Sequence, residues 1–290
     1  MSLAADTPTR KFRSNLHLFD QRKHVRIQPC LQVGARLHGP GCCLRIGLRE
    51  YRFQGGQHLL EDRVLHTSRL DPPTMNPMSH PPKDLQDIAA RTLAYYERHA
   101  ERFRAGTEGH DVSQNIAALL RHIEGTPPFR ILDFGCGPGR DLKTFWSLGH
   151  FAIGLEGSAQ FAAMARSRSA CEVWQQDFLQ LKLPGHHFDG LFANASLFHV
   201  PSAALPGVLN QLHATLKPRG VLFSSNPRGD NEEGWNGDRY GVFHDLHGWR
   251  RYLTAARFEE LEHYYRPTDL PRDQQPWLAS VWRALPTQMS

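Results

Sequence analysis

The chain has 290 residues, of which 40% are hydrophobic and 22% charged, so it is long and apolar enough to bury a sizeable core. No apolar run approaches the roughly 18 residues of a membrane span, and the N-terminus lacks the apolar core of a secretory signal. The five cysteines form no C-x-x-C pair, which argues against a disulfide framework. We therefore expect a cytoplasmic protein without a membrane partner or a metal site.

Residues 1–74 hold the whole basic excess of the chain. They carry 12 Lys and Arg against 6 Asp and Glu, whereas the remaining residues carry 22 against 23. A basic binding tail, an organelle transit segment and a stretch upstream of the true start are all open interpretations, although acidic residues such as Asp6 argue against transit. We expect residues 1–74 to be disordered or upstream of the true start, and residues 75–290 to form one domain. Because that domain is nearly neutral, an extended nucleic-acid-binding face is not expected on it.

Two helices are predicted before the first strand. Apolar and aromatic residues recur at helical spacing from Leu85 to Phe103 and again from Ile116 to Ile123. Asp111 or Ser113 is placed to cap the second helix.

A short apolar strand, residues 131–134, then runs into a glycine-rich loop. Gly135, Gly137 and Gly139 let the backbone turn tightly and approach a ligand, and the following helix offers free N–H groups at its positive end. A dinucleotide site would read G-x-G-x-x-G, but the position of its third glycine is Arg140 here. The loop predicts a cofactor site and disfavours hydride transfer.

Three further strands lead into polar residues. Residues 150–155 lead to Glu156, which lies 21 residues after Gly135, about the distance at which a carboxylate receives ribose hydroxyls. Residues 171–174 precede Asp177, and residues 188–194 end at Asn194. Open α/β sheets bind ligands at the carboxyl ends of their strands, so these side chains should gather in one site.

The C-terminal part adds helices, a fifth strand and a long connection. Leucines from Leu205 to Leu216 repeat at helical spacing, Lys217-Pro218-Arg219-Gly220 reads as a helix stop, and residues 221–225 form the strand. The connection over residues 226–244 contains three aromatic residues, which favours a packed substrate lid over an ornamental surface loop. Another helix is expected around residues 246–256.

This ordered set of motifs resembles the class I S-adenosylmethionine-dependent methyltransferases, in the branch with one compact domain that acts on small molecules. The resemblance covers residues 85–284 and implies an α/β fold, a Rossmann-like doubly wound seven-stranded sheet, mostly parallel, with an antiparallel C-terminal hairpin from residues 261–265 and 277–283. Arg140 and Glu156 depart from the commonest pattern, in which a small residue or threonine and an aspartate are frequent, but neither departure removes a needed function.

The same resemblance implies the cofactor site. Asp133 and the glycine loop would hold the methionine end of S-adenosylmethionine, Glu156 the ribose and Asp177 the adenine amino group. The implied cofactor-binding residues are Asp133, Gly135, Cys136, Gly137, Glu156, Gly157, Asp177, Phe178, Asn194 and Ala195.

The acceptor site is predicted beside the end of the fourth strand. His199, five residues past that strand, is a candidate general base or substrate ligand, and the alternative is an imidazole bonded to a neighbouring loop carbonyl. The predicted substrate-binding residues are Tyr96, His199, Trp235, Arg239, Tyr240, His244, Tyr265 and Arg266.

Methyl transfer to a small polar metabolite is the favoured function. Arg239 and Arg266 would suit an anionic group on that acceptor. Two alternatives remain: an RNA methyltransferase recruited by the basic N-terminal segment, and a catalytically silent cofactor-binding protein. The intact glycine loop, with Glu156 and Asp177, argues against the silent protein. The sequence identifies neither the acceptor atom nor the oligomeric state.

Overall fold

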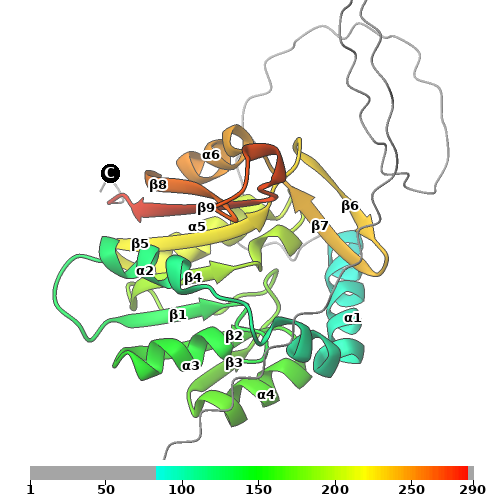
Figure 1. Ribbon diagram of the computed structural model, residues 1–290, viewed down its shortest axis with the longest axis horizontal. Helices are drawn as coiled ribbons and strands as arrows, with labels where there is room; N and C mark the ends of the chain where they lie inside the picture. The colour runs from blue at the N-terminus through cyan, green and yellow to red at the C-terminus, as the bar shows by residue number, and fades with distance from the viewer. Residues whose placement is uncertain (1–82, 287–290) are drawn as a thin grey trace, which may run out of the picture. The chain divides into compact units, whose positions relative to one another are not determined.

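A computed structural model describes residues 83–286, so the predictions for residues 1–74 lie outside the described part (Figure 1). Seven strands form one sheet in the order β3-β2-β1-β4-β5-β9-β8. They are β1 Arg130–Phe134, β2 Phe151–Glu156, β3 Glu172–Gln175, β4 Phe188–Asn194, β5 Leu216–Pro227, β8 Phe258–Arg266 and β9 Trp277–Ala284. The first five run parallel, and β9 pairs antiparallel with both β5 and β8. The predicted mostly parallel sheet with an antiparallel C-terminal hairpin is confirmed.

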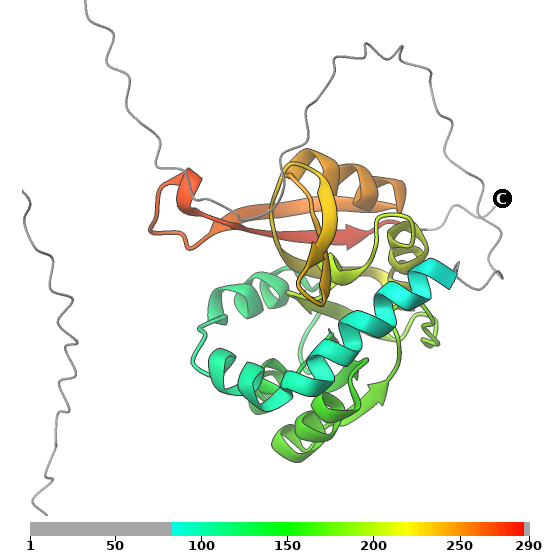
Figure 2. The same cartoon turned by 90° about the vertical axis from the view of Figure 1, so that its right-hand side faces the viewer.

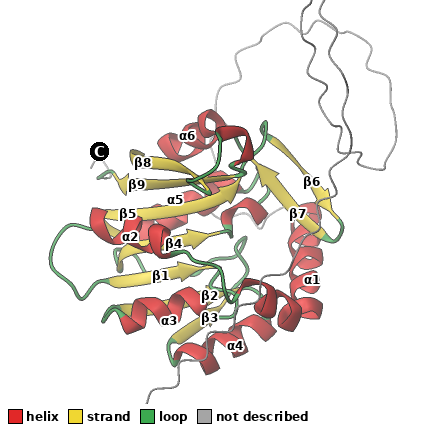
Figure 3. Cartoon of the chain, viewed as in Figure 1, coloured by secondary structure: helices red, strands yellow, loops and turns green. Residues whose placement is uncertain are grey.

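Helices cover both faces of the sheet (Figure 3). The helices are α1 Lys83–Thr107, α2 Ser113–His122, α3 Arg140–Ser147, α4 Ala159–Ser169, α5 Leu205–Thr215 and α6 Leu246–Ala255, with two 3₁₀ turns, η1 Leu197–His199 and η2 Arg272–Gln274. One core joins the sheet to α5 and α6 through residues such as Leu209 and Trp249. The other joins it to α2, α3 and α4 through residues such as Leu119 and Phe145. The helices therefore pack their apolar residues against the sheet, as expected for amphipathic helices. No helix among the described residues is both long and apolar enough to cross a membrane.

Local signals in the sequence account for several element boundaries. Ser158 is the N-cap of α4, and its Oγ accepts a hydrogen bond from the backbone N–H of Phe161 at 3.2 Å. At the start of α2 the expected cap takes a different form, because Asp111 Oδ1 accepts from Ser113 N while Val112 occupies the N-cap position.

The long helix α1 has a kink at His99, where the backbone leaves the helical region. The ring Nδ1 of His99 donates to the Tyr95 carbonyl at 2.8 Å. That carbonyl is the usual acceptor of the His99 backbone N–H, so the side chain competes with the helix ladder at this turn.

Two features differ from the sequence prediction. The connection after β5 is an ordered hairpin, β6 Glu232–Asn236 and β7 Arg239–Phe243, joined by Gly237 and Asp238. A two-residue turn that contains glycine is a typical hairpin signal, so this element was readable from the sequence. Strand β5 also begins earlier than predicted, at Leu216, because residues 217–220, which the sequence predicts only as the end of the preceding helix, are part of the strand. The pairing of β5 with β4 shifts register in this part of the strand.

The carboxyl end of the parallel strands is the end covered by α1 and the β6–β7 hairpin (Figure 1). Viewed from that side, α1 crosses the molecule diagonally beneath the hairpin (Figure 2). The backbone N–H of Tyr240 on β7 donates to Thr92 Oγ1 on α1 at 3.1 Å, so the two elements touch directly. Helix α1 and the β6–β7 hairpin, together called the roof, cover the edge at which the candidate site lies.

Candidate functional site

A cavity of about 810 Å³ opens at this edge of the sheet. Its walls come from α1, the glycine loop, the ends of β2 and β4, the segments after β3 and β4, the hairpin and the turn between β8 and β9. Most of the residues predicted from the sequence line it, namely Tyr96, Gly135, Cys136, Gly137, Glu156, Gly157, Asp177, Phe178, Asn194, Ala195, His199, Arg239 and Arg266.

Five predicted residues lie elsewhere. Asp133 is buried behind the glycine loop, and Tyr265 lies under the guanidinium of Arg272. The side chains of Trp235 and Tyr240 pack against each other on the hairpin. His244 lines a second cavity of only about 10 Å³ beside Trp249. Direct contact of these side chains with a ligand in the large cavity is therefore not supported by their placement.

The glycine loop leaves space where a ligand can lie against its backbone. Gly137 lines the cavity at φ +52°, and a Cβ built on it would meet nothing within 4 Å. At Gly139 the reason for glycine is packing, since a Cβ there would lie 2.7 Å from the Cα of Ala165 in α4.

Glu156 is a buried carboxylate held in one orientation by the backbone. Its Oε2 accepts from Gly137 N and its Oε1 from Ser158 N, both at 2.9 Å. Burial raises the pKa of Glu156, and these backbone hydrogen bonds oppose that rise. Each carboxylate oxygen can accept a second bond, so Glu156 has capacity for hydroxyl donors from the cavity that it lines.

Asp177 and Phe178 lie side by side on the cavity wall. Asp177 Oδ1 accepts from Leu179 N at 2.9 Å, which fixes the carboxylate at the start of its turn. The ring of Phe178 stacks on Phe134 with centroids 4.3 Å apart. A flat heteroaromatic ring with an amino donor would fit this pair.

Buried acidic groups converge behind and beside the glycine loop. Burial and the nearby charge of Asp141 raise the pKa of Asp133 well above its usual range, and Asp133 Oδ2 has no hydrogen-bond partner within residues 83–286. Asp141 and Glu156 line the cavity itself. Acidic walls fit a ligand that carries positive charge, such as a sulfonium and an ammonium group.

A chain of hydrogen bonds that the sequence analysis missed crosses the back of the site. Tyr264 Oη donates to Asn115 Oδ1 at 2.9 Å, Asn115 Nδ2 to Asn194 Oδ1 at 3.0 Å, and Asn194 Nδ2 to Asp141 Oδ2 at 3.2 Å. Arg140 completes the chain with two bonds to Asp141, at 2.6 and 2.9 Å. Arg140 also donates to the Thr107 carbonyl at the end of α1. The arginine that departs from the commonest motif therefore connects the glycine loop to α1.

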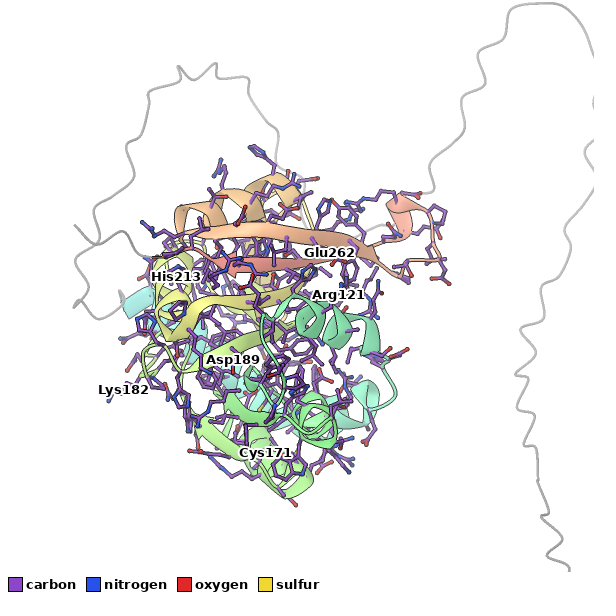
Figure 4. All side chains as sticks on the ribbon, turned by 90° about the vertical axis from the view of Figure 1, so that its left-hand side faces the viewer. Arg121, Cys171, Lys182, Asp189, His213 and Glu262 are labelled. Atoms are coloured by element: carbon purple, nitrogen blue, oxygen red, sulfur yellow. The ribbon has the colours of Figure 1, made fainter. Side chains whose placement is uncertain are left out.

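Helix α2, which carries Asn115, is anchored at its C-terminal end. Arg121 and His122 at the end of α2 both bond to Glu262 on the edge strand β8, the His122 contact being 2.9 Å long. Arg121 and Glu262 lie close together at that edge (Figure 4). The only sequence signal for Asp141 was its place in the first turn after the glycine loop, and nothing near Asn115 marked it as a site residue.

Both ring nitrogens of His199 form hydrogen bonds. Its Nδ1 lies 2.6 Å from the Tyr240 carbonyl, which can only accept, so Nδ1 carries the proton. Its Nε2, 2.7 Å from Tyr96 Oη, therefore accepts from the phenol. Burial lowers the pKa of His199 to about 4. The loop-carbonyl bond of the alternative interpretation is present, although His199 also lines the cavity.

Neutral His199 should make stability depend on pH. Its pKa falls from 6.5 to about 4 on folding, so this contribution is fully present above pH 6.5 and is lost as pH falls toward 4. The full loss would be about 3 kcal/mol, reduced by any water in the cavity. We expect His199→Gln, which keeps a donor and an acceptor but cannot titrate, to lose less free energy of unfolding than the parent between pH 6.5 and 4.5 in urea denaturation. Equal losses for the two proteins would contradict this assignment.

The hairpin roof is fastened to α1 by exposed charges. Asp238 in the β6–β7 turn forms salt bridges with Arg91 at 2.9 Å and Arg98 at 3.1 Å. The Arg91 guanidinium also lies 4.2 Å from the centre of the Trp235 ring. This cluster holds the far end of the hairpin against the helix.

Asp238→Asn should loosen the hairpin without unfolding the protein, because exposed ion pairs contribute little to global stability. We expect faster amide hydrogen exchange over residues 232–243, with little change in melting temperature. Glu101→Gln, which removes an exposed salt bridge to Arg104 elsewhere on α1, is the matched control. If the amides of the hairpin exchange at the parent's rate in both variants, the salt bridges of Asp238 do not hold the hairpin against α1.

Comparison with known proteins places these features in a class. Residues 131–220 match the family model described as a methyltransferase domain. The fold is similar to that of the 1,6-didemethyltoxoflavin-N1-methyltransferase of Burkholderia thailandensis, with TM-score 0.59 and 22% identity over 75% of this chain and 94% of that one. These findings identify a methyltransferase domain over residues 131–220, in a chain whose fold is similar to that of a methyltransferase solved with S-adenosylhomocysteine.

Curated relatives are similar over a shorter stretch. The malonyl-[acyl-carrier protein] O-methyltransferase of Enterobacter lignolyticus is 30% identical over 146 residues, which are 49% of this chain and 54% of that protein. The trans-aconitate 2-methyltransferase of Azoarcus sp. is 32% identical over 117 residues, 39% of this chain and 45% of that protein. The chain thus spans about half the length of the curated relatives it matches.

Proposed function

We propose that this protein transfers the methyl group of S-adenosylmethionine to a small polar metabolite that carries an anionic group. The single observation that carries the proposal is the 810 Å³ cavity, which joins Glu156 and the glycine loop to a second wall formed by Tyr96, His199 and two arginines. A cavity of this size is ample for a cofactor with a small acceptor beside it.

The residues of the first wall would bind the cofactor, whose sulfonium supplies an already activated methyl group. Glu156 would accept the ribose hydroxyls, and Asp177 with Phe178 would hold the adenine. The backbone at Gly137 would lie against the methionine part, with Asp141 and Asn194 close by. Bonds from Gly137, Ser158 and Asn194 hold these acceptor groups in place, so little reorganisation is needed on binding.

The second wall would orient the acceptor and exclude water. Tyr96 and His199 present a neutral hydrogen-bonded pair to the cavity. Arg239 and Arg266 line it too, and neither forms a salt bridge with any carboxylate within the described range 83–286. Guanidinium groups that line a cavity without a carboxylate partner are suited to an anionic ligand.

The names of two relatives support an acidic acceptor. They are named for methyl transfer to malonyl-[acyl-carrier protein] and to trans-aconitate, whose malonyl and aconitate groups are acids, whereas other relatives are named as sterol 24-C-methyltransferases. The near-neutral charge of the chain after residue 74 disfavours an RNA acceptor.

Incubation with methyl-labelled S-adenosylmethionine and a metabolite extract tests the proposal. We expect the label to appear in a small anionic product that mass spectrometry can identify, and Glu156→Ala to abolish it. If S-adenosylhomocysteine binds but no label leaves the cofactor, the protein is a silent binder and the proposed transfer is wrong.

A further inference from the structure

We infer that the acceptor atom is a carboxylate oxygen and that the product is a methyl ester. This inference rests on the proposed methyl transfer and narrows its acceptor. The hydrogen-bond directions in the acceptor wall leave no free lone pair on the imidazole, and neither arginine there has a carboxylate partner among residues 83–286.

The Tyr96–His199 pair offers no base to the acceptor. An alcohol or a phenol acceptor must lose a proton during transfer, so it needs a base within hydrogen-bond reach. The Tyr240 carbonyl fixes the proton on His199 Nδ1, and Tyr96 Oη donates to the lone pair on Nε2. Burial, against the opposing effect of Arg239, raises the pKa of Tyr96, so the phenol stays protonated, and its one proton is donated to His199.

Among the other titratable groups of the cavity, the four carboxylates accept hydrogen bonds from protein groups. Asp141 is bonded to Arg140 and Asn194, and Glu156 accepts from two backbone N–H groups while its remaining lone pairs would be taken by the ribose hydroxyls of the cofactor. Asp177 accepts from Leu179 N, and Asp111 at the rim accepts from Ser113 N, which lowers its pKa and makes it a weak base. Burial raises the pKa of Cys136, which keeps the thiol protonated. His110, exposed at the rim, is the remaining competitor.

A carboxylate needs no base. At neutral pH it is already ionised, so its lone pair can form the new O–C bond directly. As that bond forms, the S–C bond breaks and its electron pair stays on sulfur. One negative and one positive charge are removed, the reacting carboxylate becomes a neutral ester group and the sulfonium a neutral thioether, and no proton moves. Loss of both charges is favoured in a cavity with apolar walls such as those of Phe103 and Phe161.

The two arginines indicate a second acid group on the same acceptor. An arginine bound to the reacting oxygen would weaken it as a nucleophile, whereas an arginine bound to a distant carboxylate holds the acceptor in register. Arg239 approaches Tyr95 and Tyr96 under the hairpin, while Arg266 donates to the Asp111 carbonyl near the rim. We therefore expect a di- or tricarboxylic acid.

The chemical stability of the product tests this directly. Methyl esters release methanol in mild alkali, whereas methyl ethers, amines and thioethers do not. We expect the label transferred to a metabolite extract to become volatile after alkali. Label that stays with the product would overturn the inference while leaving the proposed methyl transfer intact, and failure of S-adenosylhomocysteine to bind would instead overturn the proposed function.

Defined probes sharpen the test. With the tricarboxylate trans-aconitate and the dicarboxylate glutarate as probes, and 5-hydroxypentanoate as the alcohol analogue of glutarate, we expect ester formation from at least one of the two polycarboxylates and no ether from the hydroxy acid. The rate should be flat between pH 6.5 and 9. Ether formation would contradict the inference, as would a rate that rises over pH 6 to 8 and loses this rise in His110→Gln.

Binding gives a readout without turnover. In the complex with S-adenosylhomocysteine, Arg266→Gln should weaken the binding of trans-aconitate or glutarate, whichever of the two forms an ester, at least tenfold in calorimetry. Arg102→Gln removes the same charge from an exposed position of α1 outside the cavity, and it should bind like the parent. Equal affinity in all three proteins would overturn the role of the arginine.

Discussion

Glu156→Ala should weaken binding of S-adenosylhomocysteine by roughly 100-fold. The change removes the acceptor for two ribose hydroxyls, and hydrogen bonds to a charged group contribute about 1.5 to 3 kcal/mol each. It also leaves the backbone N–H groups of Gly137 and Ser158 without their partner, so the loop loses part of its fixed shape.

Isothermal calorimetry measures this effect, with Glu156→Gln as the matched control. Glutamine keeps the length and one acceptor oxygen, so its affinity should lie between those of the parent and the alanine variant. If the alanine variant binds within threefold of the parent, the ribose does not lie on Glu156. The cofactor assignment would then have to be abandoned.

Gly139→Ala should cause a large loss of stability. Gly139 has φ +81°, and a Cβ there would lie 2.7 Å from the Cα of Ala165. Left-handed backbone costs about 1 to 2 kcal/mol for alanine, and overpacking against backbone adds about 1 to 3 kcal/mol. We expect a loss of about 3 kcal/mol, which is roughly 6 to 12 °C in melting temperature.

Gly137→Ala separates this packing effect from ligand binding. Its Cβ would meet no protein atom within 4 Å, so the variant should lose only about 1 kcal/mol of stability. The methyl group would stand in the space left for the cofactor, and affinity for S-adenosylhomocysteine should fall more than tenfold. Similar melting temperatures for the two variants, or full affinity in Gly137→Ala, would contradict this division of roles.

The sequence predicted the parts of the site that depend on local patterns. Alternating glycines after an apolar strand, and carboxylates at the ends of the next strands, follow from the βαβ repeat and can be read along the chain. Glu156 and Asp177 both line the cavity for this reason.

Other parts could not be read because they depend on contacts between distant segments. Asn115 meets Asn194 across 79 residues and Tyr264 across 149 residues, and no local pattern signals either bond. His199 lines the cavity, but its suitability as a base depends on the Tyr240 carbonyl, which reaches it only because the hairpin folds over α1. The same fold turns Trp235 and Tyr240 toward each other, away from their predicted role as ligand contacts.

A crystal structure of the protein with S-adenosylhomocysteine tests the central claim most directly. We expect both ribose hydroxyls within hydrogen-bond distance of Glu156, the adenine beside Phe178 with its amino group at Asp177, and the thioether sulfur facing the wall of Tyr96 and His199. Density for the ligand outside this cavity, or a ribose that makes no contact with Glu156, would contradict the account.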